Sequence, residues 1–122
     1  MQNDPHFLAF VGNVLALRLD HYESSGFTFT KVDVDVDIPA NAKFARVLSV
    51  ERDPVTGAKQ REQIHSFIAL CDNETKGLGK VLKGDVMKPA TWKAPARHAR
   101  GNIYDDYNGL ENACSYGPGY LR

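Results

Sequence analysis

Basic and aromatic side chains gather between residues 88 and 104, and they are the part of this sequence best suited to chemistry. The stretch TWKAPARHARGNIY carries Lys93, Arg97 and Arg100, and Lys88 lies just upstream. No acidic residue occurs between positions 86 and 104. Guanidinium groups pair bidentately with phosphate, and a ring such as that of Trp92 stacks on a nucleobase. The stretch therefore predicts a surface for single-stranded nucleic acid or a nucleotide-like anion.

The candidate site comprises the cationic, polar and aromatic residues of this stretch: Lys88, Trp92, Lys93, Arg97, His98, Arg100, Asn102 and Tyr104. Pro95 and Gly101 favour a short helix between them, in which Arg97 and Arg100 are i,i+3 neighbours. Two alternatives stay open. Trp92 is either a stacking ring or a core anchor. The cations either face outward or pair within the chain, with the carboxylates at positions 105, 106 and 111 or with those at 33, 35 and 37.

The DVDVD run offers a second arrangement of charged groups. In a strand, Asp33, Asp35 and Asp37 share one face at intervals of roughly 6.6–6.8 Å, which is too wide for one small cation. An EF-hand needs Gly and Glu where this sequence has Ile38 and Phe44. We expect a solvated strand face that discourages edge pairing, with contact to a cationic partner as the alternative.

The sequence contains no pattern typical of catalysis or metal binding. Its histidines, His6, His21, His65 and His98, have neither the HExxH spacing nor a nearby cysteine. His65 is expected to be packed or hydrogen-bonded within a strand. GLGKVLKG lacks the hydroxyl that ends a phosphate-binding loop. We therefore predict no catalytic residues, no metal and no cofactor, and an enzyme is the least favoured class.

The elements around the candidate site predict one α+β domain spanning residues 1–122. Asp4 and Pro5 are typical of a helix start, and apolar residues at helical spacing continue the helix to about Gly26. Strand-like runs follow at 27–40, 43–52 and 60–72, and the segment DPVTGAK makes a hairpin turn between the last two. A change of phase near Thr30 predicts a bulge. We expect a mostly antiparallel sheet of about four strands under the helix, and an irregular C-terminal segment with the short helix.

Composition is typical of a globular chain in a reducing compartment. Fifteen basic residues balance fifteen acidic ones, so net charge predicts no polyanion partner and only the local cluster does. The two cysteines, Cys71 and Cys114, are far apart and are expected to be free thiols. No signal peptide or membrane span is visible, so we predict a cytosolic protein.

The segment GDVMKPATWKAPARHARGNIYD and the ending YGPGYLR resemble a family of small, uncharacterised tailed-bacteriophage proteins. The matching positions are Gly84, Asp85, Lys88, Trp92, Lys93, Ala94, Pro95, Ala96, Ala99, Arg100, Gly101, Asn102, Ile103, Tyr116, Gly117, Tyr120, Leu121 and Arg122. Pro89 and Thr91 replace the usual Ala and Ser. The resemblance implies a phage protein that acts in the bacterial cytoplasm or the virion, and it implies no activity.

Three functions remain in view. The first is a small binding protein that recognises nucleic acid or a nucleotide-like anion through residues 88–104. The second is a host-takeover or anti-defence factor that binds a bacterial protein through its acidic strand face or its tyrosine-rich C-terminus. The third is a minor virion component.

Overall fold

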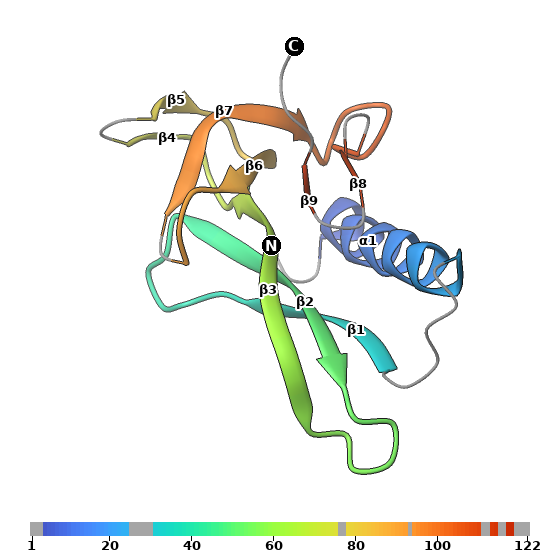
Figure 1. Ribbon diagram of the computed structural model, residues 1–122. Helices are drawn as coiled ribbons and strands as arrows, with labels where there is room; N and C mark the ends of the chain where they lie inside the picture. The colour runs from blue at the N-terminus through green and yellow to red at the C-terminus, as the bar shows by residue number, and fades with distance from the viewer. Residues whose placement is uncertain are drawn as a thin grey trace.

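In the part of the chain that the structure describes, one helix packs on a five-stranded antiparallel sheet (Figure 1). The computed structural model describes residues 4–24, 31–75, 78–92, 94–110, 113–114 and 117–118, and at some of these, including Arg97, His98 and Arg100, it describes the backbone alone. The elements are α1 (Pro5–Ser24), β1 (Lys31–Asp37), β2 (Phe44–Arg52), β3 (Lys59–Ala69), β4 (Asn73–Thr75), β5 (Gly79–Val81), β6 (Asp85–Pro89), β7 (Pro95–Asn102), β8 (Ala113–Cys114) and β9 (Gly117–Pro118).

The main sheet is an antiparallel meander with the strand order β1-β2-β3-β6-β7. The small β4–β5 hairpin is inserted between β3 and β6, and β8 pairs with β9 in a third, two-stranded sheet. The expected α+β class and antiparallel sheet are confirmed, with five strands in the main sheet instead of about four. The hairpin predicted around DPVTGAK is the β2–β3 connection, in which the Asp53 carboxylate accepts hydrogen bonds from the backbone N–H groups of Val55 and Thr56.

Helix α1 begins where the sequence predicts. The Asp4 carboxylate accepts hydrogen bonds from the backbone N–H groups of His6 and Phe7, at 2.8 and 3.4 Å, as an N-cap does. The residue predicted to end the helix, Gly26, and the bulge predicted near Thr30 lie outside the described residues.

The buried face of α1 is narrower than its sequence suggests. Phe7, Phe10 and Val14 are buried, whereas Leu8 and Leu19 are 56% and 43% exposed. Burying one such apolar side chain contributes about 1.5–3 kcal/mol, which outweighs the cost of about 1 kcal/mol for a glycine within the helix, here at position 12. The three buried residues pack against Ala45 and Val47 of β2, Ile68 of β3, Val86 of β6 and Ile103, which follows β7.

The aspartates of β1 form ion pairs with cations from the neighbouring strands. The Asp37 carboxylate lies 2.7 Å from Arg46 Nη2, and the Asp35 carboxylate lies 2.9 Å from Arg52 Nη2. Arg52 Nε also approaches Asp33, at 3.5 Å. The expected acidic strand face is therefore present, and the ion pairs that the described residues form with it come from Arg46 and Arg52 of β2 and from Lys59 of β3.

These ion pairs cover an apolar part of the sheet. In the register of β1 and β2, Val50 pairs with Asp33, Leu48 pairs with Asp35 and Arg52 pairs with Lys31. The Arg52 side chain therefore crosses the position of Val50 to reach Asp35, and Val50 is fully buried. Long basic side chains commonly cover apolar surface in this way while the charged end stays near water.

We expect Arg52→Met to lower the free energy of unfolding by about 1–2 kcal/mol, since it breaks two partly exposed ion pairs and leaves Asp33 and Asp35 without their common partner. Urea denaturation measures the change. Arg61→Met is the matched control, because Arg61 is exposed on β3 and forms no ion pair with any described residue. Equal destabilisation by both variants would contradict a covering role for Arg52.

The prediction of a short helix between Pro95 and Gly101 is wrong, because this segment forms strand β7. It pairs with β6 from Asp85↔Asn102 to Pro89↔Pro95, with two irregularities in register. A helix of this length is marginal by its own hydrogen bonds, whereas the open side of β6 offers the segment interstrand partners. Proline is tolerated at the first residue of a strand, which is where it lies here.

Candidate functional site

The loop that joins β6 to β7 presents Trp92 at the tip of a hairpin. The backbone N–H groups of Ala90 and Thr91 each donate to the carbonyl of Ala94 at 3.1 Å, and the Ala94 N–H donates to Thr91 Oγ1 at 3.1 Å. These bonds close the loop within a few residues. The tip is therefore a tight turn whose shape does not depend on burial of the tryptophan.

Trp92 is half exposed, and its backbone carbonyl accepts a hydrogen bond from Arg46 of β2. Its side chain is 49% accessible to solvent. Arg46 Nη1 donates to the Trp92 carbonyl at 2.9 Å, while Nη2 of the same guanidinium contacts Asp37 at 2.7 Å. Trp92 is therefore not a buried anchor of the core, which was one of the two alternatives for this ring. Since the carbonyl rather than the ring makes the anchoring contact, part of the indole surface is left open to a ligand.

A groove of about 300 Å³ lies between the hairpin tip and β3. It is lined by Glu62, Gln63 and Ile64 of β3 and by Pro89, Ala90, Thr91 and Trp92 of the tip. Strand β6 pairs with β3 at Phe67 and Ile68, and among the described strands none pairs with the lower part of β3 on the β6 side (Figure 1). The groove therefore combines an aromatic ring with polar residues of a strand edge.

The structure describes the side chain of only one cation of the candidate site, Lys88. Lys88 lies half-buried in β6. Arg97, His98 and Arg100 belong to β7, which occupies one end of the strand order of the main sheet, and their side chains lie outside what the structure describes. Lys93 also lies outside it. The hairpin places Lys88 before Trp92 on β6 and the backbone of positions 97, 98 and 100 after it on β7. The role of these cations in binding stays a prediction.

Asn102 and Tyr104 lie at the other end of the hairpin from Trp92. Asn102 pairs with Asp85, which is four residues along β6 from Pro89, or roughly 13 Å at the usual strand rise. Its amide donates to the Lys83 carbonyl at 2.9 Å and to Asp85 Oδ1 at 3.1 Å. Its Oδ1 accepts from the Tyr104 N–H at 2.8 Å. The structure therefore separates these residues from the groove and engages the Asn102 amide within the fold.

The Tyr104 side chain links the C-terminal end of β7 to the start of α1. Its hydroxyl donates to Asp4 Oδ2 at 2.6 Å, and its ring centroid lies 5.0 Å from that of His6. Burial, together with this hydrogen bond to a carboxylate, raises the pKa of Tyr104 to about 12. The same hydrogen bond lowers the pKa of Asp4. These contacts lie at the helix N-cap, so they serve the architecture of the domain.

Asp105 and Asn108 organise the loop after β7, and sequence reasoning did not single out their roles. Asp105 Oδ1 accepts from the N–H groups of Tyr107 and Gly109, and Oδ2 accepts from that of Asn102. Burial acts to raise the pKa of Asp105, but these three hydrogen bonds outweigh it and lower the pKa. Asn108 donates to the carbonyls of His6 and Ile103. Asp105 is therefore bound to its own loop, as Asx-type turns allow.

Sequence reasoning also missed Arg46 of β2, which holds the Trp92 carbonyl, and the β3 residues that line the groove. Arg46 is far from Trp92 in the sequence, and Glu62 lies in a run of polar residues with no distinguishing motif. No local signal in the sequence identifies either residue, because their proximity to the tip arises from the strand order of the folded sheet.

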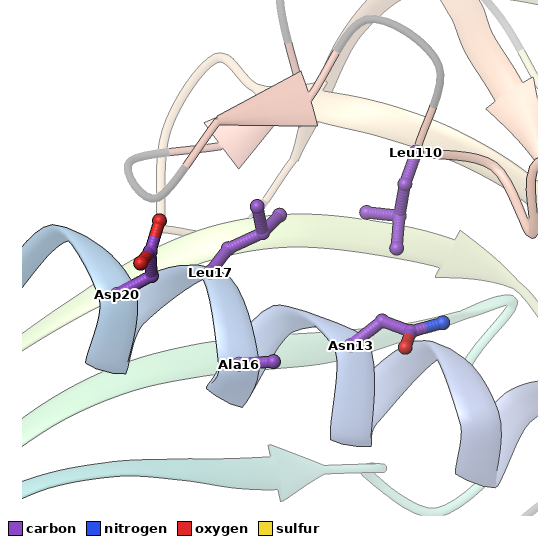
Figure 2. Close-up of a pocket in the computed structure, with 5 residues that line it drawn as sticks. All are labelled: Asn13, Ala16, Leu17, Asp20 and Leu110. Carbon is purple, nitrogen blue, oxygen red and sulfur yellow. The ribbon is translucent and has the colours of Figure 1, made fainter.

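A second groove, of about 390 Å³, runs along α1. Figure 2 shows Asn13, Ala16, Leu17 and Asp20 following one another along the helix, with Leu110 across from them. The lining is mostly apolar, and its one charged residue is acidic. None of these five residues is aromatic, so base stacking is better suited to the groove at Trp92.

The predictions about metals and histidine can be compared with the described residues. None of the described His, Cys, Asp and Glu side chains come together in a group of three or more that could hold a metal ion.

His65 is fully buried, with Nδ1 3.1 Å from Ser66 Oγ and its ring edge-on to Phe10, which confirms the expected packed role. Cys71 is exposed and free. Among the described helices none has the length and apolar character needed to cross a membrane.

Comparison with known proteins gives a family without an assigned activity. No curated protein and no solved structure matches the chain. A family model, described as a family of unknown function, matches residues 18–121 and so includes every strand and the groove at Trp92. The chain therefore belongs to this family of unknown function, DUF7717.

Proposed function

We propose that this protein binds single-stranded nucleic acid through the β6–β7 hairpin, with Trp92 as the ring on which a base stacks. The observation that carries the proposal is that Trp92 is half exposed while its main chain is fixed by Arg46. A residue whose main chain is already fixed loses less conformational freedom when its ring stacks on a base. Base stacking on such rings contributes about 1–3 kcal/mol per base and tolerates any sequence.

The distribution of charge on the hairpin supports the same function. Between positions 85 and 102 the single acidic residue is Asp85, at the end opposite to Trp92. Its carboxylate accepts hydrogen bonds from the Leu82 N–H and from the Asn102 amide. The basic residues of the hairpin, Lys88, Lys93, Arg97 and Arg100, are those we assign to phosphate.

Single-stranded rather than duplex nucleic acid fits the groove. The faces of bases in a duplex are covered by their neighbours, and a ring at a hairpin tip reaches a base face only in an unstacked strand. With a volume of about 300 Å³, the groove next to Trp92 is at the small end of the range for small-molecule sites, which suits a single base.

Binding of a short single-stranded oligonucleotide is expected to quench tryptophan fluorescence and to weaken with salt. Trp92 is the chain's one tryptophan, so its emission reports on the proposed stacking directly. Each phosphate contact contributes about −0.7 to the slope of log affinity against log salt, and four cations give roughly −3. The charge-reversal pair Arg97→Glu and Arg100→Glu should abolish binding and leave the melting temperature nearly unchanged. If the oligonucleotide did not bind at low salt, the proposed function would be contradicted.

A role in a phage-infected bacterium is a further part of the proposal, and the similarity of residues 84–103 and of the chain end to a phage family supports it. The rival function, binding of a host protein through Asp33, Asp35 and Asp37, has less support because these carboxylates are paired with Arg46, Arg52 and Lys59. Affinity purification from infected cells with nuclease treatment separates the two functions, and mass spectrometry of purified particles tests a place in the virion.

A further inference from the structure

The groove beside Trp92 carries a hydrogen-bond acceptor that is suited to distinguishing one base from another. Building on the proposed function, we infer that the base stacked on Trp92 places its edge against the Glu62 carboxylate, so that the site prefers bases with an exocyclic amino group. Cytosine, adenine and guanine have such a group, and thymine and uracil do not.

The register of the sheet places Glu62 on the side of the sheet that forms the groove. Glu62 pairs with Val50 and Ile64 pairs with Leu48, so both side chains lie on the same face as the ion pairs of β1. Both residues line the groove together with Trp92. The carboxylate therefore stands on the wall of the groove that faces the tip.

The Glu62 carboxylate is held in place and keeps capacity for another donor. Lys59 Nζ donates to Glu62 Oε2 at 2.8 Å, and this hydrogen bond raises the pKa of Lys59. An ionised carboxylate has about four acceptor positions, and one lysine contact occupies a single one. An amino group such as cytosine N4–H₂ is the donor that Glu accepts in base recognition.

The main chain of β3 adds further polar groups to the same wall. Adjacent residues of a strand turn their N–H and C=O groups to opposite sides, so either Glu62 or Gln63 directs these groups away from β2 and toward the groove. Strand β6 does not pair with β3 at this level. A base edge therefore meets both a carboxylate and main-chain groups, whereas the O4 carbonyl of thymine would face the negative charge of Glu62.

The test compares oligo(dC) and oligo(dT) of equal length in low salt, with the fluorescence of Trp92 as the readout. We expect oligo(dC) to bind about tenfold more tightly, which is the usual size of one charge-assisted hydrogen bond at a base edge. Glu62→Gln should reduce the ratio to about twofold or less, because an amide both donates and accepts. Glu74→Gln is the matched control, since it removes the same charge from an exposed residue of β4 outside the groove, and it should keep the ratio.

The outcomes distinguish this inference from the function it rests on. Equal binding of oligo(dC) and oligo(dT), or a preference for oligo(dC) that survives in Glu62→Gln, overturns the role of Glu62 and leaves single-strand binding intact. Failure of both oligonucleotides to bind or to quench the fluorescence overturns single-strand binding and the preference together.

Discussion

Replacing Gly109 by alanine is expected to lower the free energy of unfolding by about 3 kcal/mol, the combined cost of a left-handed backbone and of overpacking a core. Gly109 has φ of +75°, and a Cβ atom there would lie 2.6 Å from Val86 Cγ2 and 3.2 Å from the backbone carbon of Asn102. Val86 is fully buried and has little room to move. Denaturation in urea, followed by circular dichroism, measures the change.

Gly57 is the matched control for this prediction. It has φ of +74°, but a Cβ atom at Gly57 would meet nothing within 4 Å. Gly57→Ala therefore isolates the backbone cost, which is about 1–2 kcal/mol. If the two variants were equally stable, close packing between Gly109 and β6 would not explain why glycine is needed after β7.

Replacing Trp92 by alanine is expected to weaken binding of a single-stranded oligonucleotide by about 1–3 kcal/mol, or about 5- to 150-fold, because the stacking surface is lost. The stability of the fold should change little. Half of the ring is exposed, and the hydrogen bond from Arg46 is accepted by the backbone carbonyl, which alanine keeps. Anisotropy of a labelled oligonucleotide gives the affinity without use of the tryptophan signal.

Tyr107→Ala is the control for loss of an exposed aromatic ring. Tyr107 is 61% exposed in the loop that follows β7 and does not line the groove. Its replacement should leave the affinity unchanged. Wild-type affinity in Trp92→Ala would exclude stacking, and a loss of several kcal/mol of stability in that variant would assign Trp92 to the architecture instead.

Local patterns determined much of the fold. The pair Asp4 and Pro5 marked the start of α1, because a capping carboxylate and a fixed φ act within the first turn of a helix. The alternation in DVDVD gave the two faces of β1, and the turn residues between positions 53 and 59 gave the β2–β3 hairpin. Each of these signals depends on neighbours in the sequence, so the sequence alone contains them.

The residues between Pro95 and Gly101 predict a helix, whereas the folded protein forms a strand there. The prediction depends on two local signals, the proline and the glycine. Proline at the start and glycine at the end satisfy helix capping, but they are equally compatible with an edge strand that begins with proline. The deciding factor is β6, whose open side provides interstrand hydrogen bonds along the segment. The partner strand, and not the residues of the segment, selected the conformation.

The sequence by itself determined that cations and a tryptophan share one segment, that an acidic strand precedes it, and that a capped helix opens the domain. Only the tertiary structure decided which charges pair and which ring is exposed. Arg46 reaches both Asp37 and the Trp92 carbonyl, and Glu62 comes to the groove beside Trp92, because β2 and β3 bring distant positions to the hairpin tip. Ion pairs and exposure depend on distances in space, and strand order sets those distances when the chain folds.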